Sequence, residues 1–246
     1  MRQSIDINCD LGEGIGNEAQ LMPHISSCNL ACGGHAGDDA TIREIVSLSK
    51  AHQVGVGAHP SFPDRENFGR KIMEMPMTEL KHSVLDQILK VATECEKQNW
   101  PMHHIKTHGA LYNLCAKDLA YAEMITELVT QNFSEIPIYA PLNSVMATVA
   151  QGKIKVLFEA FADRNYNPDG SLVSRSENNA VITDKIALVK HVLRMVKKGE
   201  IEAVNGVTFL ANIDTVCMHG DTQNAVDLLV DITEALSQGN IKLKLA

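Results

Sequence analysis

The feature that most constrains the fold of this chain is a regular alternation of short apolar runs with longer helical patterns. Such alternation implies right-handed crossover connections and a mainly parallel sheet. About seven strand–helix units within 246 residues favour a closed but irregular TIM-like (β/α) barrel, and an open doubly wound sheet is the alternative. The runs expected to form strands are residues 5–10, 28–32, 54–58, 104–108, 136–140, 155–161, 203–207, 216–219 and 241–245.

Segments between these runs carry apolar side chains at steps of three and four residues, the spacing of amphipathic helices. Thr183 is expected to cap the start of one helix, and Gly199 is expected to end it in the left-handed conformation. The expected helices span 78–98, 183–198, Asp38 or Asp39 to His52, and Asp221 or Thr222 to just before Gly239.

No linker or low-complexity segment divides the chain, so we expect one domain over residues 1–246. The net charge of −8 argues against a nucleic-acid-binding domain, which would carry a basic face. The sequence contains no run of 18 apolar residues, so it predicts no helix that spans a membrane. The N-terminal residues lack the pattern of a secretory signal, and the six cysteines include no CxxC pair. We therefore expect reduced thiols in a cytoplasmic protein.

Polar residues follow most of the predicted strands, usually beside glycine. The carboxyl ends of parallel barrel strands meet at one rim, where the active sites of this architecture lie. Histidines and acids at equivalent strand ends therefore predict one shared site. The residues that follow the strands in this way are Asp10, Glu13, His35, Asp38, His59, Lys106, His108, Glu159, Asp163, Arg164, His219 and Asp221.

The alternation within single strands predicts a polar barrel interior. Asp6, Asn8 and Asp10 share one face of the first strand, and the residues between them are apolar. Barrel interiors are normally filled by branched apolar residues, because a buried polar group costs several kcal/mol unless it is paired. A polar lumen is therefore typical of a site that is kept for its chemistry.

Two charged segments after predicted strands are expected to form long loops on this rim, where loops often bind ligands. Arg70 lies in the first segment, and Arg164 and Arg175 lie in the second. A guanidinium group can hold a carboxylate or a phosphate with two hydrogen bonds. Arg65 and Lys71 are more typical of surface charge.

At these positions the sequence resembles the LamB/YcsF family. The resemblance extends over nearly the whole chain, with the blocks in the family's order. Thr107, Gly34 and Ala160 stand where the family usually has Pro, an aromatic residue and Val. The matching blocks are INCDLGEG (7–14), NLACGGHAGD (29–38), GAHPSFPD (57–64), FGR (68–70), KTHGALYN (106–113), FADR with the loop that follows it (161–175) and TVCMHGD (215–221).

The resemblance implies an irregular TIM-like barrel of the glycoside hydrolase/deacetylase kind. It also implies the role of the A subunit in an ATP-hydrolysing 5-oxoprolinase. That cyclic amide hydrolase opens 5-oxoproline (pyroglutamate) to L-glutamate together with subunits B and C. ATP is then a co-substrate of the complex, and this chain has no GxxxxGK[ST] loop of its own.

This chemistry needs a base for water, donors for developing negative charge and a group that holds the substrate carboxylate. The candidate catalytic residues are Asp10, His35, His59, His108 and His219. The candidates for binding substrate or phosphate are Glu13, Asp38, Arg70, Lys106, Glu159, Asp163, Arg164, Arg175 and Asp221.

Two other functions fit the same residues. The chain could be a stand-alone metal-dependent deacetylase or amidohydrolase, with Asp10, His59, His108 and His219 as candidate ligands for a divalent ion. It could also be a non-catalytic subunit that binds substrate while its partners carry out the reaction. The spacing of the histidines does not decide between these functions, because no HxH or HExxH pair occurs.

Overall fold

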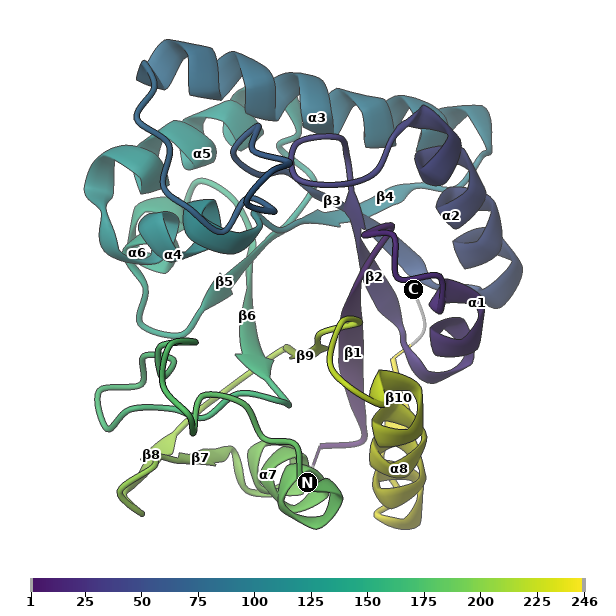
Figure 1. The fold of residues 1–246 in the computed structure, drawn as a ribbon, viewed down its shortest axis with the longest axis vertical. Coiled ribbons are helices and arrows are strands. Elements are labelled where there is room, and N and C mark those ends of the chain that lie inside the picture. Colours follow the sequence, from purple (N-terminus) through teal and green to yellow (C-terminus); the bar gives the residue numbers. More distant parts are fainter. Residues whose placement is uncertain (1, 245–246) are drawn as a thin grey trace.

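The structure is a computed structural model in which residues 2–244 are described. Seven parallel strands form a closed barrel, because β9 pairs with β6 on one side and with β1 on the other (Figure 1). The predicted TIM-like barrel is therefore confirmed, and the open sheet is wrong. The strands are β1 (Ser4–Leu11), β2 (Ser27–Ala31), β3 (Gly55–His59), β4 (Met102–Ile105), β5 (Ile138–Pro141), β6 (Val156–Phe161) and β9 (Thr215–Met218).

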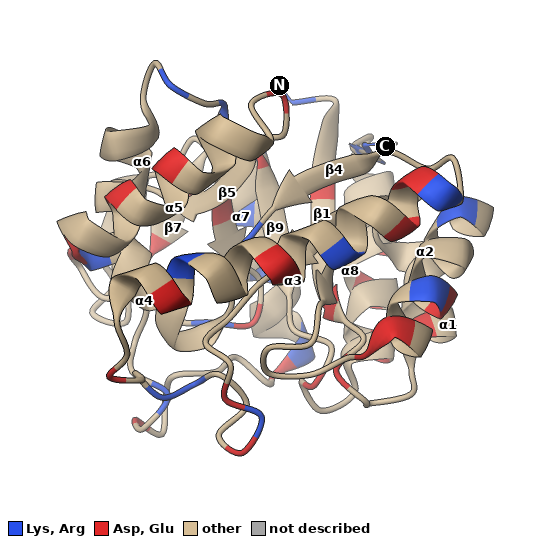
Figure 2. Ribbon diagram, turned by 90° about the horizontal axis from the view of Figure 1, so that it is seen from above, with Lys and Arg blue, Asp and Glu red and all other residues tan. Residues whose placement is uncertain are grey.

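Helices surround this barrel and cover its outer face (Figure 1). Within residues 2–244, no helix is both long and apolar enough to span a membrane. Figure 2 shows acidic and basic residues interspersed along the outer helices α2 and α3. The helices are α1 (Glu18–Leu21), η1 (Met22–His24), α2 (Asp39–His52), α3 (Met77–Lys97), α4 (Gly109–Lys117), α5 (Leu119–Asn132), α6 (Val145–Ala150), α7 (Lys185–Lys198) and α8 (Ala225–Gln238).

Three of the expected strands differ from the structure. The strand expected over 104–108 is β4, which ends at Ile105, so Lys106 and His108 follow the strand instead of ending it. Residues 203–207 form the turn between β7 (Glu200–Glu202) and β8 (Thr208–Leu210), an antiparallel hairpin outside the barrel. The turn forms because Gly206 adopts a positive φ and Ala203 bonds to Val207 across it. The strand expected over 241–245 is β10 (Lys242–Leu243), which pairs with the start of β1, and Leu245 lies outside the described residues.

The helix boundaries follow from local capping. The predicted start and end of α2 are confirmed, and the Asp38 side chain caps it by accepting a hydrogen bond from the Thr41 amide at 2.8 Å. Asp184 caps α7 in place of the predicted Thr183, by accepting from the Ala187 amide. Gly199 ends α7 at φ 65°, as predicted.

Helix α8 begins at Ala225, after Asn224, and not at the predicted Asp221 or Thr222. The side chains of these two residues bond to other parts of the barrel mouth. The Asp221 carboxylate pairs with Arg70, and the Thr222 hydroxyl donates to Asp163. Tertiary contacts thus hold this segment as a loop at the site and delay the helix.

The core lies outside the strands, between the barrel and its helices, while the lumen is polar. Ile5, Ile7 and Cys9 of β1 belong to the buried apolar cluster. Asn8 and Asp10, which alternate with them, make side-chain hydrogen bonds across the lumen. The predicted separation of faces is confirmed. The six cysteines are all free and buried, as expected for reduced thiols.

Glycine at position 57 is required by the packing of the lumen. A Cβ atom there would lie 2.2 Å from Nε2 of His104. The His104 ring has no room to move, because it stacks on Tyr139 at 3.8 Å and its Nε2 lies 2.7 Å from Oδ1 of Asn29. Gly57 therefore allows the imidazole to fill the barrel floor.

We expect Gly57→Ala to lower the free energy of unfolding by about 1–3 kcal/mol, because the methyl group overpacks the lumen. Urea unfolding of the purified chain measures this loss. In a His104→Ala background the same change should cost less, since the clashing ring is gone. An equal cost in both backgrounds would contradict the steric explanation.

Candidate active site at the barrel mouth

One cavity of about 480 Å³ lies at the carboxyl ends of the strands. Side chains that are far apart in the sequence meet there, as the strand-end pattern predicted. The strands β1, β3, β4 and β9, together with the loops that follow them, supply the polar wall. The predicted residues that line this cavity are Asp10, His59, Arg70, Lys106, His108, Arg164, Arg175 and His219.

The centre of the site is the buried ammonium group of Lys106. Its Nζ lies 2.9 Å from Oε1 of Glu159 and 3.2 Å from Oδ1 of Asp10. It also lies 3.2 Å from Sγ of Cys217. Burial alone would lower the pKa of Lys106, but the carboxylates of Asp10 and Glu159 outweigh burial and hold that pKa well above its usual range. Lys106 is therefore a permanent positive charge beneath the cavity.

A network of amides and hydroxyls fixes the carboxylates around Lys106. Asn8 donates to Oε1 of Glu159 at 2.9 Å and to Thr215 at 2.7 Å. Asn29 donates to Asp10 at 2.6 Å, and the hydroxyl of Tyr112 donates to Oε2 of Glu159 at 2.8 Å. Burial of Asp10 opposes ionisation, but Lys106 and His59 hold the pKa of Asp10 well below its usual range. Both carboxylates are therefore held in fixed orientations.

These network residues were not among the predicted site residues. Asn8 could have been proposed, because it lies on the lumen face of β1 between two acids. Tyr112 lies four residues after His108, so the two share one face of the first turns of α4. Asn29 gave no signal beyond its position in a buried strand, since its partners come from β1 and β4.

Three of the predicted histidines form one cluster on one side of the cavity. The rings of His35 and His108 stack at 3.7 Å, and Nδ1 of His108 lies 2.9 Å from Nε2 of His59. Oε1 of Glu13 lies 3.0 Å from Nε2 of His35. Burial holds the pKa of His108 well below its usual range and lowers that of His35 to about 4. Both rings are therefore neutral at pH 7.

The fourth predicted histidine is in a different electrostatic environment. Nδ1 of His219 lies 2.9 Å from Oδ1 of Asp163, whose Oδ2 accepts a hydrogen bond from Thr222 at 2.6 Å. Burial disfavours the charged ring, but Asp163 outweighs burial and raises the pKa of His219. With Nδ1 bonded to Asp163, Nε2 is the nitrogen left for a ligand in the cavity. This arrangement can move a proton near neutral pH.

The three predicted arginines line the cavity but differ in availability. Arg164 is buried and donates to the carbonyl oxygens of Val173 and Ala180, so it holds the 164–180 loop in place. Arg70 pairs with Asp221 at 2.6 Å. Arg175 is exposed, and within residues 2–244 it makes no ion pair. Arg175 is therefore the guanidinium best placed to accept an anion.

Some predicted binding residues lie elsewhere. The Asp38 carboxylate caps α2 and is exposed, and it is not among the residues that line the cavity. Asp221 is held by Arg70 at the rim. Glu159 lies below the cavity and lines a smaller adjoining space of about 170 Å³ with Tyr112 and Phe161.

Two groups of side chains could hold a metal ion in the part of the chain that the structure describes. The first is Glu13, His35, His59 and His108, and the second is Asp10, Cys217 and His219. The predicted ligand set of Asp10, His59, His108 and His219 is thus divided between them. In the second group, Lys106 lies 3.2 Å from both Cys217 and Asp10 and competes electrostatically with a cation.

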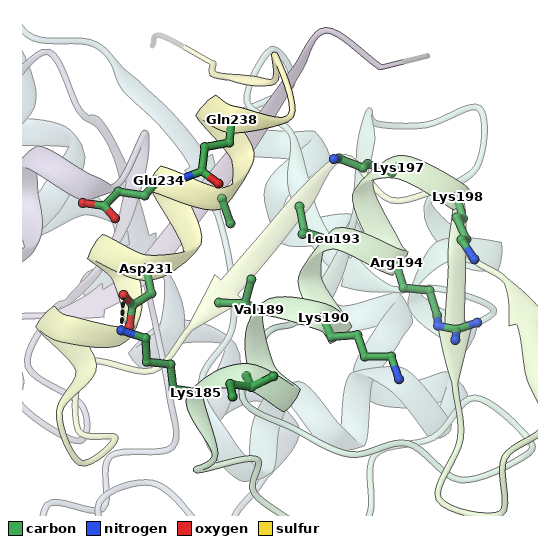
Figure 3. A pocket seen from close by; sticks show the side chains of 12 residues that line it. Lys185, Val189, Lys190, Leu193, Arg194, Lys197, Lys198, Asp231, Glu234 and Gln238 are labelled. Carbon is green, nitrogen blue, oxygen red and sulfur yellow. Dashed lines mark ion pairs between the residues drawn. The ribbon is translucent and has the colours of Figure 1, made fainter.

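A larger groove, of about 560 Å³, lies between α7 and α8 (Figure 3). Its floor is apolar, with Val189 and Leu193, and its edges carry lysines such as Lys185, which pairs with Asp231. Among the described residues that line this groove, none is a histidine and none belongs to a buried charge network. The barrel mouth is therefore the stronger candidate for an active site.

Comparisons with known proteins agree with this architecture. A model of the LamB/YcsF family matches residues 5–246. A protein of Clostridium beijerinckii that is named as the A subunit of 5-oxoprolinase is 40% identical over 245 residues, which cover 97% of this chain and 96% of that protein. A protein of the same name from Histophilus somni is 40% identical over 240 residues, with 97% of each covered.

The crystal structure of a lactam utilization protein from Thermus thermophilus superposes with a TM-score of 0.93 and 35% identity. The superposition covers 99% of this chain and all of that protein. A T48 deacetylase with substrate superposes with a TM-score of 0.50 and 11% identity, over 99% of this chain and 88% of that one. This second likeness concerns the fold alone, and it agrees with the deacetylase-like barrel that was predicted.

We expect Lys106→Met to lower the free energy of unfolding by about 3–5 kcal/mol at pH 7, because it leaves two buried carboxylates without their cation. The loss should shrink as the pH falls to 5, where protons can neutralise the unpaired carboxylates. In the native chain the depressed pKa of Asp10 contributes stability above about pH 4, so this contribution is still present at pH 5.

Urea unfolding at the two pH values tests this expectation. Lys185→Met is the matched control, because the Lys185–Asp231 pair lies at the surface and its removal should leave the midpoint unchanged. Equal effects of the two substitutions would show that the Lys106 cluster does not hold the barrel lumen together.

Proposed function

Because this chain belongs to the LamB/YcsF family, we propose that it is the A subunit of an ATP-hydrolysing 5-oxoprolinase. The observation that carries the proposal is full-length similarity, at 40% identity, to proteins of that name. The complete enzyme would include subunits B and C and open 5-oxoproline to L-glutamate. Six buried free thiols suit a cytoplasmic assembly.

The proposed reaction needs activation because a lactam is an unreactive amide. Transfer of the γ-phosphoryl group of ATP to the lactam oxygen releases ADP and makes the ring carbon electrophilic. Water then adds to that carbon, the C–N bond breaks, and the nitrogen takes up a proton. A second water releases phosphate from the acyl phosphate and leaves glutamate. We propose ATP as a co-substrate of the assembled enzyme and assign no nucleotide site to this chain.

The cavity contains a group suited to each of these needs. Lys106 supplies a fixed positive charge for the developing oxyanion. His219, backed by Asp163, can take a proton from water and return it to the leaving nitrogen. Arg175 is available for the substrate carboxylate or the transferred phosphate. Asp10 stays ionised and positions Lys106 and His59.

Two alternative functions remain distinguishable by experiment. The Glu13 and histidine cluster favours a stand-alone metal-dependent amidohydrolase, which would cleave an amide without ATP or partners. A non-catalytic binding subunit would tolerate changes in the cavity without loss of turnover in the complex.

We expect glutamate and ADP to be released from 5-oxoproline only when this chain is combined with subunits B and C. Asp10→Asn should lower kcat by about 10²–10⁴-fold, because it removes the charge that positions Lys106. Asp38→Asn makes the same chemical change at a predicted residue that lies outside the cavity, and it should keep full turnover. Enzymatic assays of both products measure the effect.

Each other outcome has a defined meaning. If the complete complex releases no glutamate or ADP from 5-oxoproline, the proposed substrate is wrong. Full turnover with Asp10→Asn would favour the non-catalytic subunit. Amide cleavage by this chain alone, sensitive to a chelator, would favour the amidohydrolase.

If His219 acts as the base, the acid limb of the pH–rate profile should follow the pKa of His219. Asp163→Asn removes the charge that raises the pKa of His219, so the limb should move to lower pH and kcat should fall. Thr222→Val is the control, because it removes a hydrogen bond to Asp163 but keeps the charge. NMR titration of the His219 ring in the isolated chain provides a second readout.

The pair of His219 and Asp163 also predicts that the free energy of unfolding of the native chain and of Asp163→Asn differs by an amount that depends on pH. A raised pKa of His219 in the folded chain contributes stability that is complete below about pH 6.5 and is lost as the pH rises through the folded pKa. Asp163→Asn should therefore destabilise the chain more at pH 6 than at pH 9. An unshifted acid limb and a pH-independent stability loss would refute the role of this pair.

A further inference from the structure

The hydrogen-bond partners of the clustered histidines determine which ring nitrogens carry hydrogen. Nδ1 of His59 lies 2.8 Å from the carbonyl oxygen of Lys106, and Nε2 of His108 lies 3.0 Å from that of Phe68. A carbonyl oxygen only accepts, so both of these nitrogens donate. The neutral ring of His108 then carries a lone pair on Nδ1, and Nε2 is the nitrogen of His59 that is left for another ligand. These two nitrogens face each other at 2.9 Å.

The same reasoning applies to His35. The Ser61 hydroxyl donates its one hydrogen to the carbonyl oxygen of Phe62 at 2.8 Å. It can therefore only accept from Nδ1 of His35, which lies 3.0 Å away. Nε2 of His35 is left with a lone pair, and its neighbour at 3.0 Å is a carboxylate oxygen of Glu13. One nitrogen from each of the three rings and one carboxylate oxygen thus converge on the same place.

We propose that Glu13, His35, His59 and His108 form a binding site for one divalent transition-metal ion. A cation among these four atoms would be coordinated by all of them. The proposal does not rest on the proposed substrate or on subunits B and C, since it concerns this chain by itself.

The distances are those of a slightly open coordination shell. The four ligand atoms all lie within 4.8 Å of one another. Bonds of about 2.1 Å in a tetrahedral site would place neighbouring ligand atoms roughly 3.4 Å apart. The spacings of 2.9 Å between His59 and His108, and of 3.6 Å between His108 and Glu13, lie on either side of that value.

The surroundings of the rings also resemble those of metal-binding histidines. Such histidines usually donate their other ring N–H to a carbonyl or similar oxygen, which fixes the ring orientation. All three histidines do so here, through Lys106, Phe68 and Ser61. The loop that provides Phe68 and Ser61 fits closely, because a Cβ at Gly69 would lie 3.0–3.2 Å from His35, His108 and Ser61.

The donor set selects the kind of ion. Three imidazole nitrogens and one carboxylate suit Zn²⁺ and other first-row divalent ions, whereas Mg²⁺ and Ca²⁺ prefer oxygen ligands. Two ligands, His59 and His108, line the main cavity, so an ion there would be reached from the substrate side. It could then polarise a carbonyl group or activate water.

Titration of the chelator-treated chain with Zn²⁺, followed by calorimetry, tests the proposal without substrate or partners. We expect one ion per chain and a rise in Tm on binding. Glu13→Gln and His35→Gln should each weaken binding by about 100-fold or more, since loss of a ligand exceeds the roughly 10–100-fold loss typical of outer-sphere changes. Co²⁺ should give visible absorption bands that disappear in the same variants.

His219→Gln and Cys217→Ser are the matched controls, because they belong to the second possible metal group at the same rim. Both should bind Zn²⁺ as the unmodified chain does. Three results would overturn the proposal: no saturable binding by the unmodified chain, binding lost only in the control variants, or binding that none of the four substitutions alters. Because the isolated chain is tested, failure of the metal site and failure of the 5-oxoprolinase activity remain distinguishable.

Discussion

The interaction on which the site depends is the charge of Lys106, buried between Asp10 and Glu159 inside the barrel. Removing a charge from water costs several kcal/mol, and only well-placed opposite charges offset that cost. The ammonium therefore fixes the positions of residues from β1, β6 and β9 at once. A lumen filled with apolar side chains would be at least as stable, so this arrangement is best explained by its chemistry.

The two sides of the cavity show how one environment yields two kinds of histidine. Burial is the main cause that lowers the pKa of His35 and of His108. His219 is also buried, but the adjacent Asp163 carboxylate raises its pKa. Groups whose environments push their pKa values apart are typical of sites where acid–base work and ligand binding are divided. The proposed metal ligands lie on one side and the proposed proton carrier on the other.

Much of the fold could be predicted because its signals are local. The alternation of β1, the start of α2 at Asp38 and the end of α7 at Gly199 depend on spacing and capping within a few residues. The predictions failed where distant contacts outweigh local preference. Thr222 has the chemistry of a helix cap, but its hydroxyl bonds to Asp163, 59 residues away, and α8 begins later. Asp38 has the chemistry of a site residue, but its carboxylate is already used as a cap.

The sequence by itself determined which chemical groups would stand at the strand ends, because the period of two assigns each residue of a strand to one face. Only the tertiary structure decided what each group can do. Barrel closure through the β1–β9 pairing brings Asn8 within 2.7 Å of Thr215, 207 residues away. The free nitrogen of each clustered histidine is likewise set by an oxygen from another segment, such as the Phe68 carbonyl beside His108. Protonation and coordination depend on neighbours within a few ångströms, and in a closed barrel those neighbours come from distant parts of the chain.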